Sequence, residues 1–382
     1  MNSRERVLAV LNFEEPDRVP WGEFAIDFDT VEHIIGRRSF LRAKARSRIA
    51  FWEGRRDEVV RSWRDDMIEM VRKLPSLDIV HVGAMASSVA PPRGYTPEAP
   101  EKIDENTWRY ADGRVLKYSE TTADLTLVED PQMWTRRLSP EDFPAAPEVT
   151  PPDASVFEVI DPVIEAFRGE RYILGRSGGE AAMVLPGGFE RGLVEYAAHP
   201  ELIDAASRSA VARANALDRF YVRDGQDAVC WGQDFAYKSG PFISPEMFRR
   251  HCLPGIKTRV EHLRREFGMP VFKHACGNNW KLMDMFVEAG YVAYQSIQGS
   301  AGMDLPELKR RYGGKLVLWG GMPVEVLLSG PPDEIRRAVR KAVEAGKPGG
   351  GYIFGTSHSV CVGTPYDHFM TMVDEFEKVR DY

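Results

Sequence analysis

The stretch PVFKHACGNNWKLMDMFVEAGYVAYQSI, residues 270–297, contains one complete strand–helix–strand unit. Pro270–Cys276 is an apolar run of strand length, and Asn279–Ala289 places its apolar side chains at helical spacing. A second apolar run follows at Tyr291–Ile297. Strands that are apolar along their whole length and are joined by a helix are typical of a parallel sheet buried on both faces.

The same alternation continues along the chain. Eight such units favour a closed (β/α)8 barrel, the TIM-barrel fold, over an open sheet. A doubly wound sheet is the alternative, but the G-x-G-x-x-G turn after its first strand is absent. We therefore predict an α/β protein with one barrel domain over residues 1–382. The expected strands are Val19–Ile26, Leu77–Val82, Tyr172–Gly178, Ala228–Gln233, Pro270–Cys276, Tyr291–Ile297, Lys315–Gly320 and Gly351–Gly355.

Residues 95–152 interrupt this alternation of strands and helices, and the segment is rich in Pro, Asp and Glu. Within it, Thr107–Tyr118 reads as two short strands around an Asp112-Gly113 turn, which is a strong hairpin signal. We expect an insertion after the second strand, folded over the C-terminal mouth of the barrel.

Composition excludes several classes of protein. The 382 residues are 43% hydrophobic and 28% charged with a net charge of -7, so a disordered chain or a general nucleic-acid binder is not expected. The short basic stretch Arg37–Arg48 is interpreted as a solvated helix face. No apolar run approaches the roughly 18 residues of a membrane span, and no signal peptide is recognised. Four separated cysteines, Cys230, Cys252, Cys276 and Cys361, form no disulfide framework and indicate the cytoplasm.

Reactive side chains at the C-terminal ends of barrel strands are the candidates for chemistry. Because side chains alternate along a strand, His274 and Cys276 point to the same face of the fifth strand. Cys361 follows the eighth strand at the same end of the barrel. Such an N/S ligand set suits Zn²⁺ and leaves a fourth position open. From these residues alone, buried structural cysteines and a buried polar histidine are an equally good interpretation.

Other polar groups also fall at strand ends. Each can serve as a fourth zinc ligand, a general acid or a substrate contact, and each can equally be a structural hydrogen-bond partner. We single out Glu180, Asp234 and His358 as catalytic candidates, and Gly320 and Gly321 as sites where a cofactor can approach the backbone, their alternative role being turn geometry. The candidates for substrate contact are Glu23, Trp21, Phe24 and Asn278, and Asp27 is a further acid at the end of the first strand.

Four stretches are similar to the uroporphyrinogen decarboxylase superfamily: Arg4–Pro20, Gly240–Glu246, Leu318–Pro323 and Gly350–Pro365. The resemblance covers nearly the whole chain and implies a (β/α)8 barrel. True uroporphyrinogen decarboxylases carry an arginine-rich motif after the first strand, whereas Trp21–Asp27 here contains two acids and no arginine. Decarboxylation of a polyanionic porphyrinogen is therefore not expected.

Residues 270–278 instead resemble the methyltransferase branch, whose members bind zinc through H-x-C and a distant cysteine. The resemblance implies Zn²⁺ on His274, Cys276 and Cys361. It also implies methyl transfer to or from the cobalt of a cobalamin-type corrinoid. Because eight units and one insertion account for the chain, we expect that corrinoid on a partner protein.

The expected activity is demethylation of a small donor such as a methoxylated aromatic, or the reverse transfer to a thiol or tetrahydrofolate. Three alternatives remain open. They are a decarboxylase acting on a less charged tetrapyrrole, a corrinoid-independent zinc alkyltransferase, and a non-catalytic barrel that serves as a binding subunit. The direction of transfer, the fourth zinc ligand and the oligomeric state, a homodimer included, also stay open.

Overall fold

A parallel sheet forms the centre of the protein. The computed structural model describes residues 1–85 and 89–382. All neighbouring strands of the sheet pair in parallel, as expected for strand–helix units. In spatial order its seven strands are β1 (Ile79–His81), β6 (Tyr172–Gly175), β7 (Ala228–Trp231), β10 (Val271–His274), β11 (Ala293–Ser296), β12 (Val317–Gly320) and β13 (Tyr352–Ile353). Seven of the eight expected strands are thus confirmed, within shorter bounds.

The expected first strand, Val19–Ile26, is reduced to isolated bridges, so its prediction as a regular strand was wrong. Trp21 forms a parallel bridge with Leu77, just before β1, and another with Phe354, just after β13. Pro20 accepts a hydrogen bond from the Phe354 N–H at 2.9 Å but has no N–H to donate, which limits a continuous ladder. Trp21 nevertheless connects both edges of the curled sheet, and this bridging completes the TIM-barrel arrangement.

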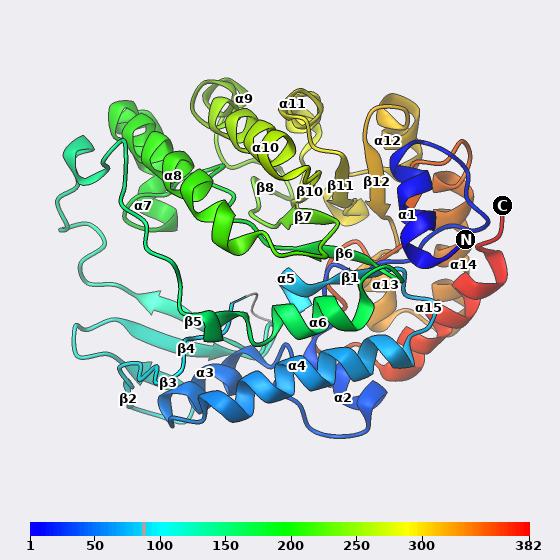
Figure 1. Ribbon diagram of the computed structural model, residues 1–382, viewed down its shortest axis with the longest axis horizontal. Coiled ribbons are helices and arrows are strands. Elements are labelled where there is room, and N and C mark those ends of the chain that lie inside the picture. The colour runs from blue at the N-terminus through cyan, green and yellow to red at the C-terminus, as the bar shows by residue number, and fades with distance from the viewer. Residues whose placement is uncertain (86–88) are drawn as a thin grey trace.

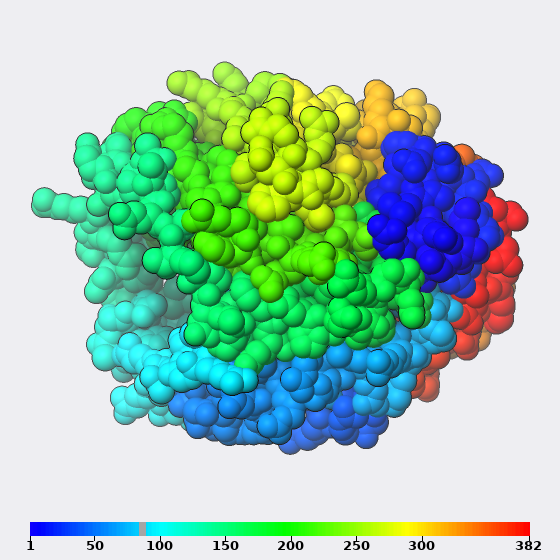
Figure 2. All heavy atoms as spheres, in the orientation of Figure 1, coloured from blue at the N-terminus to red at the C-terminus, as the bar shows by residue number. Residues whose placement is uncertain are grey.

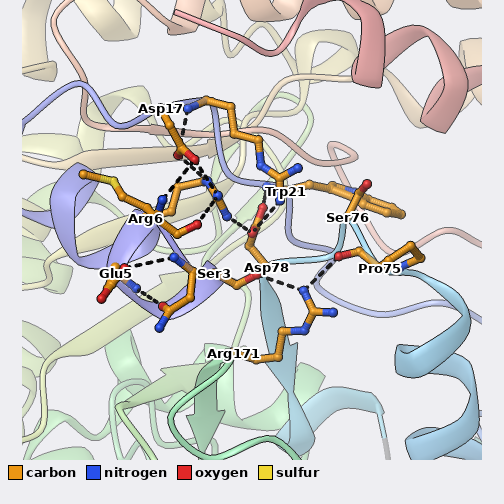
Figure 3. Close-up of polar contacts among 12 residues, drawn as sticks. Ser3, Glu5, Arg6, Asp17, Trp21, Pro75, Ser76, Asp78 and Arg171 are labelled. Carbon is orange, nitrogen blue, oxygen red and sulfur yellow. Dashed lines mark hydrogen bonds and ion pairs between the residues drawn. The ribbon is translucent and has the colours of Figure 1, made fainter.

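A buried ion network holds this closing segment at the N-terminal end of the strands (Figure 3). Arg6, on α1 (Ser3–Leu11), donates to Asp78 at 2.6 Å and to both carboxylate oxygens of Asp17 at 2.7 and 2.8 Å. Asp78 is fully buried and also accepts the backbone N–H of Trp21 at 2.9 Å. The charged residues near the N-terminus therefore hold in place the segment that closes the barrel.

Helices pack around the sheet (Figure 1). In α14 (Pro332–Gly346), Ile335, Val339 and Val343 recur at helical spacing, and all three side chains are buried. None of the helices in the described part of the chain is both long and apolar enough for a membrane span. The remaining α-helices are α2 (Phe28–Ile35), α3 (Lys44–Trp52), α4 (Arg56–Lys73), α5 (Val82–Met85), α6 (Ile160–Phe167), α7 (Phe189–Ala198), α8 (Pro200–Tyr221), α9 (Pro245–Met247), α10 (Leu253–Phe267), α11 (Met283–Ala289), α12 (Leu305–Tyr312), α13 (Val324–Ser329) and α15 (Tyr366–Val379).

The insertion after β1 contains more sheet than the expected hairpin. The turn at Asp112-Gly113 is confirmed, with Gly113 at a φ of 88° and Tyr110 N–H donating to Arg114 O at 2.9 Å. This hairpin belongs to an antiparallel sheet of β2 (Glu101–Lys102), β3 (Thr107–Arg109), β4 (Val115–Ser119) and β5 (Asp124–Glu129). Outside the insertion, a short antiparallel ribbon pairs β8 (Ala236–Tyr237) with β9 (Gly240–Pro241).

The inner face of the insertion sheet packs on α3. Trp108, Leu116 and Leu125 form a small apolar cluster with Ala45 of that helix. Further along, Arg191 of α7 donates to the carbonyl oxygens of residues 133 and 136 at 2.7 and 2.6 Å. Figure 2 shows the cyan-to-teal insertion as a lobe at one edge of the molecule. Because α7 follows the C-terminal end of β6, these contacts place the insertion on the side of the barrel where chemistry is expected.

Candidate metal centre at the C-terminal ends of the strands

Three donor atoms converge where two neighbouring strands end. The side chains of Asp234, His274 and Cys276 each offer one ligand atom, and these atoms lie within 4.8 Å of one another. His274 Nε2 lies 3.4 Å from Cys276 Sγ and 3.8 Å from Asp234 Oδ1. His274 ends β10 and Asp234 follows β7, which pairs with β10. One nitrogen, one sulfur and one oxygen donor form a set that suits zinc.

Gln295 orients the histidine. Its Oε1 accepts a hydrogen bond from His274 Nδ1, and its Nε2 donates to Thr356 O at 3.1 Å, which fixes the amide. An amide oxygen can only accept, so Nδ1 carries the proton and the Nε2 lone pair faces Cys276 and Asp234. Burial lowers the pKa of His274 to about 4, which keeps the ring neutral, as a metal ligand must be. Gln295 was not among the residues singled out from the sequence, although a lone amide in the apolar run Tyr291–Ile297 is a usable signal.

Cys276 is held in place from two sides. Its backbone N–H donates to Asp234 Oδ1 at 2.7 Å, and Ser296 Oγ donates to its Sγ at 3.6 Å. Burial, together with the nearby Asp234 carboxylate, raises the pKa of the Cys276 thiol to about 12. A cation is the group that would reverse this effect and favour the thiolate. The donor set therefore fits a metal ion better than it fits a free nucleophilic cysteine.

Cys361 does not belong to the cluster that the described residues form; Asp234 supplies the third donor instead. Cys361 lies beyond β13, and its role as a zinc ligand stays a prediction. The same loop carries His358, an exposed side chain whose ring centroid lies 6.2 Å from that of His274. His358 is thus beside the donors, where a catalytic residue is expected.

Glu180 is occupied as the partner of a buried lysine. Lys273 is fully buried, and its Nζ donates to Glu180 Oε1 and to Gln233 O, the latter at 2.6 Å. Glu180 Oε2 accepts the backbone N–H of Gln233 at 2.9 Å. This geometry does not support Glu180 as a free general acid. It makes Glu180 a positioning residue that anchors the segment just before Asp234.

The first-strand candidates separate into different roles. Trp21 is 1% exposed and packs against Phe369 and Phe376 of α15, so the structure places it in the core and not at a substrate surface. Glu23 is also buried, and accepts Trp21 Nε1 at 2.8 Å, Thr356 N at 3.1 Å and Thr356 Oγ1. Burial raises the pKa of Glu23 to about 7 despite these donors. The Glu23 carboxyl group therefore links the first-strand segment to the segment after β13, where the barrel closes.

Phe24, in contrast, covers the metal centre directly. Its ring stacks on His274 with centroids 3.7 Å apart and an interplanar angle of 13°. Phe24 also contacts His81, whose ring centroid lies 5.0 Å away and whose Nδ1 donates to Phe24 O at 2.9 Å. Burial lowers the pKa of His81 to about 3, so this second ring is neutral as well. His81 was not among the residues singled out from the sequence, although it lies next to the last residue of the expected strand Leu77–Val82.

Asn278, Gly320 and Gly321 determine the backbone conformation around the site. Asn278 Oδ1 accepts the backbone N–H of Trp280 at 3.3 Å and so shapes the loop after β10. A Cβ at Gly320 would lie 2.6 Å from Ser296 O, and one at Gly321 would lie 2.8 Å from a methyl carbon of Leu305. Close packing of strand ends, with φ values of 125° and 98°, therefore explains both glycines, and their contact with a cofactor stays a prediction.

Comparisons with known proteins agree with this architecture. A family model described as uroporphyrinogen decarboxylase (URO-D) matches residues 129–379. Uroporphyrinogen decarboxylases of Thioalkalivibrio sulfidiphilus and Paraburkholderia xenovorans are 29% and 27% identical to the chain over 147 residues, which is 36% of this chain. The matched part is 39% and 37% of those relatives, so the chain spans about two fifths of their length.

A solved structure, a methyltransferase from Methanosarcina mazei, superposes with a TM-score of 0.64. The superposition covers 99% of both chains at 16% sequence identity. At that identity the likeness shows a shared fold. Since the family match extends over most of the sequence, this chain belongs to the uroporphyrinogen decarboxylase family.

Proposed function

We propose that this protein is a zinc-dependent methyltransferase. It would move a methyl group between a small methylated substrate and the cobalt of a corrinoid carried by a partner protein. The observation that carries the proposal is the convergence of His274, Cys276 and Asp234 at the C-terminal ends of β10 and β7. The Methanosarcina mazei methyltransferase, which shares the fold over the full chain, supports the same reaction class.

The residues present fit a catalytic zinc ion. Three protein donors with an accessible position are the usual arrangement of such sites. The Asp234 side chain is 45% exposed, so the cluster can be reached from outside. Cys361 is a further proposed ligand, because its loop also brings His358 to the cluster. Zinc bound there would supply Lewis-acid chemistry to the heteroatom that carries the methyl group.

The chain itself would contribute orientation and proton transfer. Gln295 keeps His274 Nε2 directed at the cluster, and Phe24 covers the histidine ring and excludes water from that face. We assign His358 as the residue that gives a proton to the substrate heteroatom after demethylation, because its imidazole is exposed beside the donors. The partner would approach the same accessible end, since the methyl group must pass directly to cobalt.

The decisive experiment combines metal analysis with methyl transfer. The wild-type protein is expected to carry about one equivalent of zinc, and to lose most of it in Cys276→Ser and Asp234→Asn. Cys230→Ser is the matched control, because that cysteine lies outside the donor cluster. Cob(I)alamin and a panel of methyl donors are then followed for the methylcobalamin spectrum, and methylcobalamin with thiols and tetrahydrofolate for the reverse reaction. Full zinc occupancy in both ligand variants, or no spectral change in either direction, would contradict the proposal.

A decarboxylase is the second candidate, favoured by the printed names of the two curated relatives. It predicts turnover of uroporphyrinogen by the zinc-free protein. The absence of arginine from the Trp21–Asp27 segment argues against it, because a polycarboxylate would meet Glu23 and Asp27 there. Uroporphyrinogen turnover that is unaffected by Cys276→Ser would favour the decarboxylase over the methyltransferase.

A further inference from the structure

Two consecutive residues at the end of β11 contact the donors His274 and Cys276. Gln295 Oε1 accepts a hydrogen bond from His274 Nδ1, and Ser296 Oγ donates to Cys276 Sγ at 3.6 Å. β11 lies between β10 and β12 in the sheet, and its Gln295 lies opposite His274 (Figure 1). Each of these two donors therefore has a polar partner from the neighbouring strand.

The same two side chains also hold the loop that carries His358. Gln295 Nε2 donates to Thr356 O at 3.1 Å, and Ser296 Oγ donates to Ser357 O at 2.7 Å. A hydroxyl has a single proton, so the two acceptors of Ser296 share it. The pair therefore links the donor cluster to two consecutive carbonyl groups just before His358.

A regular strand would not bring both side chains to these positions. Side chains alternate along a strand, so Gln295 and Ser296 should point to opposite faces of the sheet. The backbone of Ser296 departs from strand geometry with a φ of 121°, and Ile297 follows with a φ of 52°. Both values lie in the region that favours glycine. Because rotation about the N–Cα bond moves Cβ relative to the preceding strand, this departure turns the Ser296 hydroxyl toward Cys276.

Close packing keeps the backbone in this conformation. Ser296 is fully buried and lies opposite Gly320 of β12. A Cβ on Gly320 would lie 2.6 Å from Ser296 O, so the neighbouring strand has a glycine where Ser296 approaches it. Unfavourable backbone angles persist only where the surroundings impose them, and they gather at functional sites. Here the functional feature in contact with the strained residue is the donor cluster.

We propose that Ser296 is a positioning residue that fixes Cys276 relative to the loop of His358. The strained backbone places its hydroxyl between the sulfur donor and Ser357 O, and a glycine, which would relieve the strain, would lose both contacts. This inference rests on the proposed function for the identity of the metal and for the role of His358. The contacts of the hydroxyl and the backbone angles do not depend on that function.

Two substitutions separate the strain from the hydroxyl. Ser296→Ala and Ser296→Gly both remove the hydroxyl, but only the alanine variant keeps a Cβ at the unfavourable φ. At an ordinary strand position the glycine variant is the less stable of such a pair. Here we expect Ser296→Gly to melt about 1–4 °C above Ser296→Ala, because it relieves the strain.

Metal binding measures the positioning role. In competition with a chromophoric chelator, both variants should bind zinc about tenfold more weakly than the wild type, as is usual when a partner of a metal ligand is lost. Cobalt(II) in place of zinc gives a second readout, because the charge-transfer band of its bond to sulfur responds to hydrogen bonds at the sulfur atom. Loss of the Ser296 donor should move this band to longer wavelength.

Ser47→Ala is the matched control, because Ser47 is a buried serine of α3 whose hydroxyl also donates to a backbone carbonyl, Phe40 O, at 3.0 Å. It should leave zinc affinity and the cobalt band unchanged. A purely structural hydroxyl at Ser296 would likewise change stability and leave both metal readouts as they are.

A lower melting temperature for Ser296→Gly than for Ser296→Ala, or metal readouts unchanged in both variants, would overturn the inference. A wild-type protein that binds neither ion would overturn it together with the proposed function. Weaker zinc binding in the variants of a protein that transfers no methyl group would support the inference and contradict the proposed function. Full zinc affinity in both variants, with methyl transfer intact, would do the reverse.

Discussion

Asp78 is the residue whose removal should most clearly test the barrel closure. It is fully buried and accepts three donors: Arg6 at 2.6 Å, Arg18 at 3.3 Å and the Trp21 backbone N–H at 2.9 Å. Asp78→Ala leaves the Arg6 guanidinium, whose side chain is 5% exposed, with Asp17 as its remaining carboxylate partner. It also leaves the Trp21 N–H without an acceptor at the point where the barrel closes.

The expected cost follows from these contacts. Removing one partner of a buried ion pair lowers the free energy of unfolding by about 3–5 kcal/mol. The lower end applies here, because Arg6 keeps its ion pair with Asp17. A buried N–H left unsatisfied adds about 1–3 kcal/mol. We therefore expect Asp78→Ala to destabilise the fold by about 4–6 kcal/mol, a large share of the roughly 5–15 kcal/mol of a typical domain. Asp78→Asn keeps an oxygen for Trp21 and should cost about 2–3 kcal/mol.

Urea unfolding, followed by two independent probes after reversibility has been established, measures these differences. Asp57→Ala is the control, because Asp57 pairs with Arg56 at 2.9 Å but its side chain is 74% exposed, and it should change stability by less than about 0.5 kcal/mol. Since Asp78 lies at the opposite end of the strands from the donor cluster, folded Asp78→Asn should retain its metal. If Asp78→Ala proved as stable as the control, the ion network around Asp78 would not be what holds the barrel closed.

Three further predictions address the site and its supports. Gln295→Leu should lower zinc affinity about 10–100-fold in competition with a chromophoric chelator, because His274 Nδ1 loses its acceptor; unchanged affinity would remove Gln295 from the site. Glu23 has its pKa raised to about 7, above an unfolded value of about 4.3, so its contribution to stability is present at low pH and is lost as the pH rises through about 7. The stability of wild type relative to Glu23→Gln should therefore fall from about pH 5 to about pH 8, and a flat difference would exclude this titration. Gly320→Ala should lower thermal stability by about 1–3 kcal/mol, because its Cβ would meet Ser296 O at 2.6 Å; an unchanged melting temperature would refute the packing argument.

Much of the architecture could be predicted from patterns within short stretches of sequence. The apolar runs of residues 270–297 predicted β10, α11 and β11 because strand and helix have different periods, and each period is a property of a few consecutive residues. The Asp112-Gly113 turn was predictable for the same reason, since a tight turn depends on the φ angles of its own residues. The placement of His274 and Cys276 on one face of a strand followed from the alternation of side chains.

Contacts between strands required the tertiary structure. Gln295 meets His274 because the parallel register of β10 and β11 sets these two residues opposite each other. Asp234 becomes the third donor because β7 pairs with β10, so that the loop after one strand lies against the end of the other. Trp21 joins both edges of the sheet through partners 56 and 333 positions away, Leu77 and Phe354. Register and closure are set by packing over the whole barrel, and no short stretch of sequence contains that information.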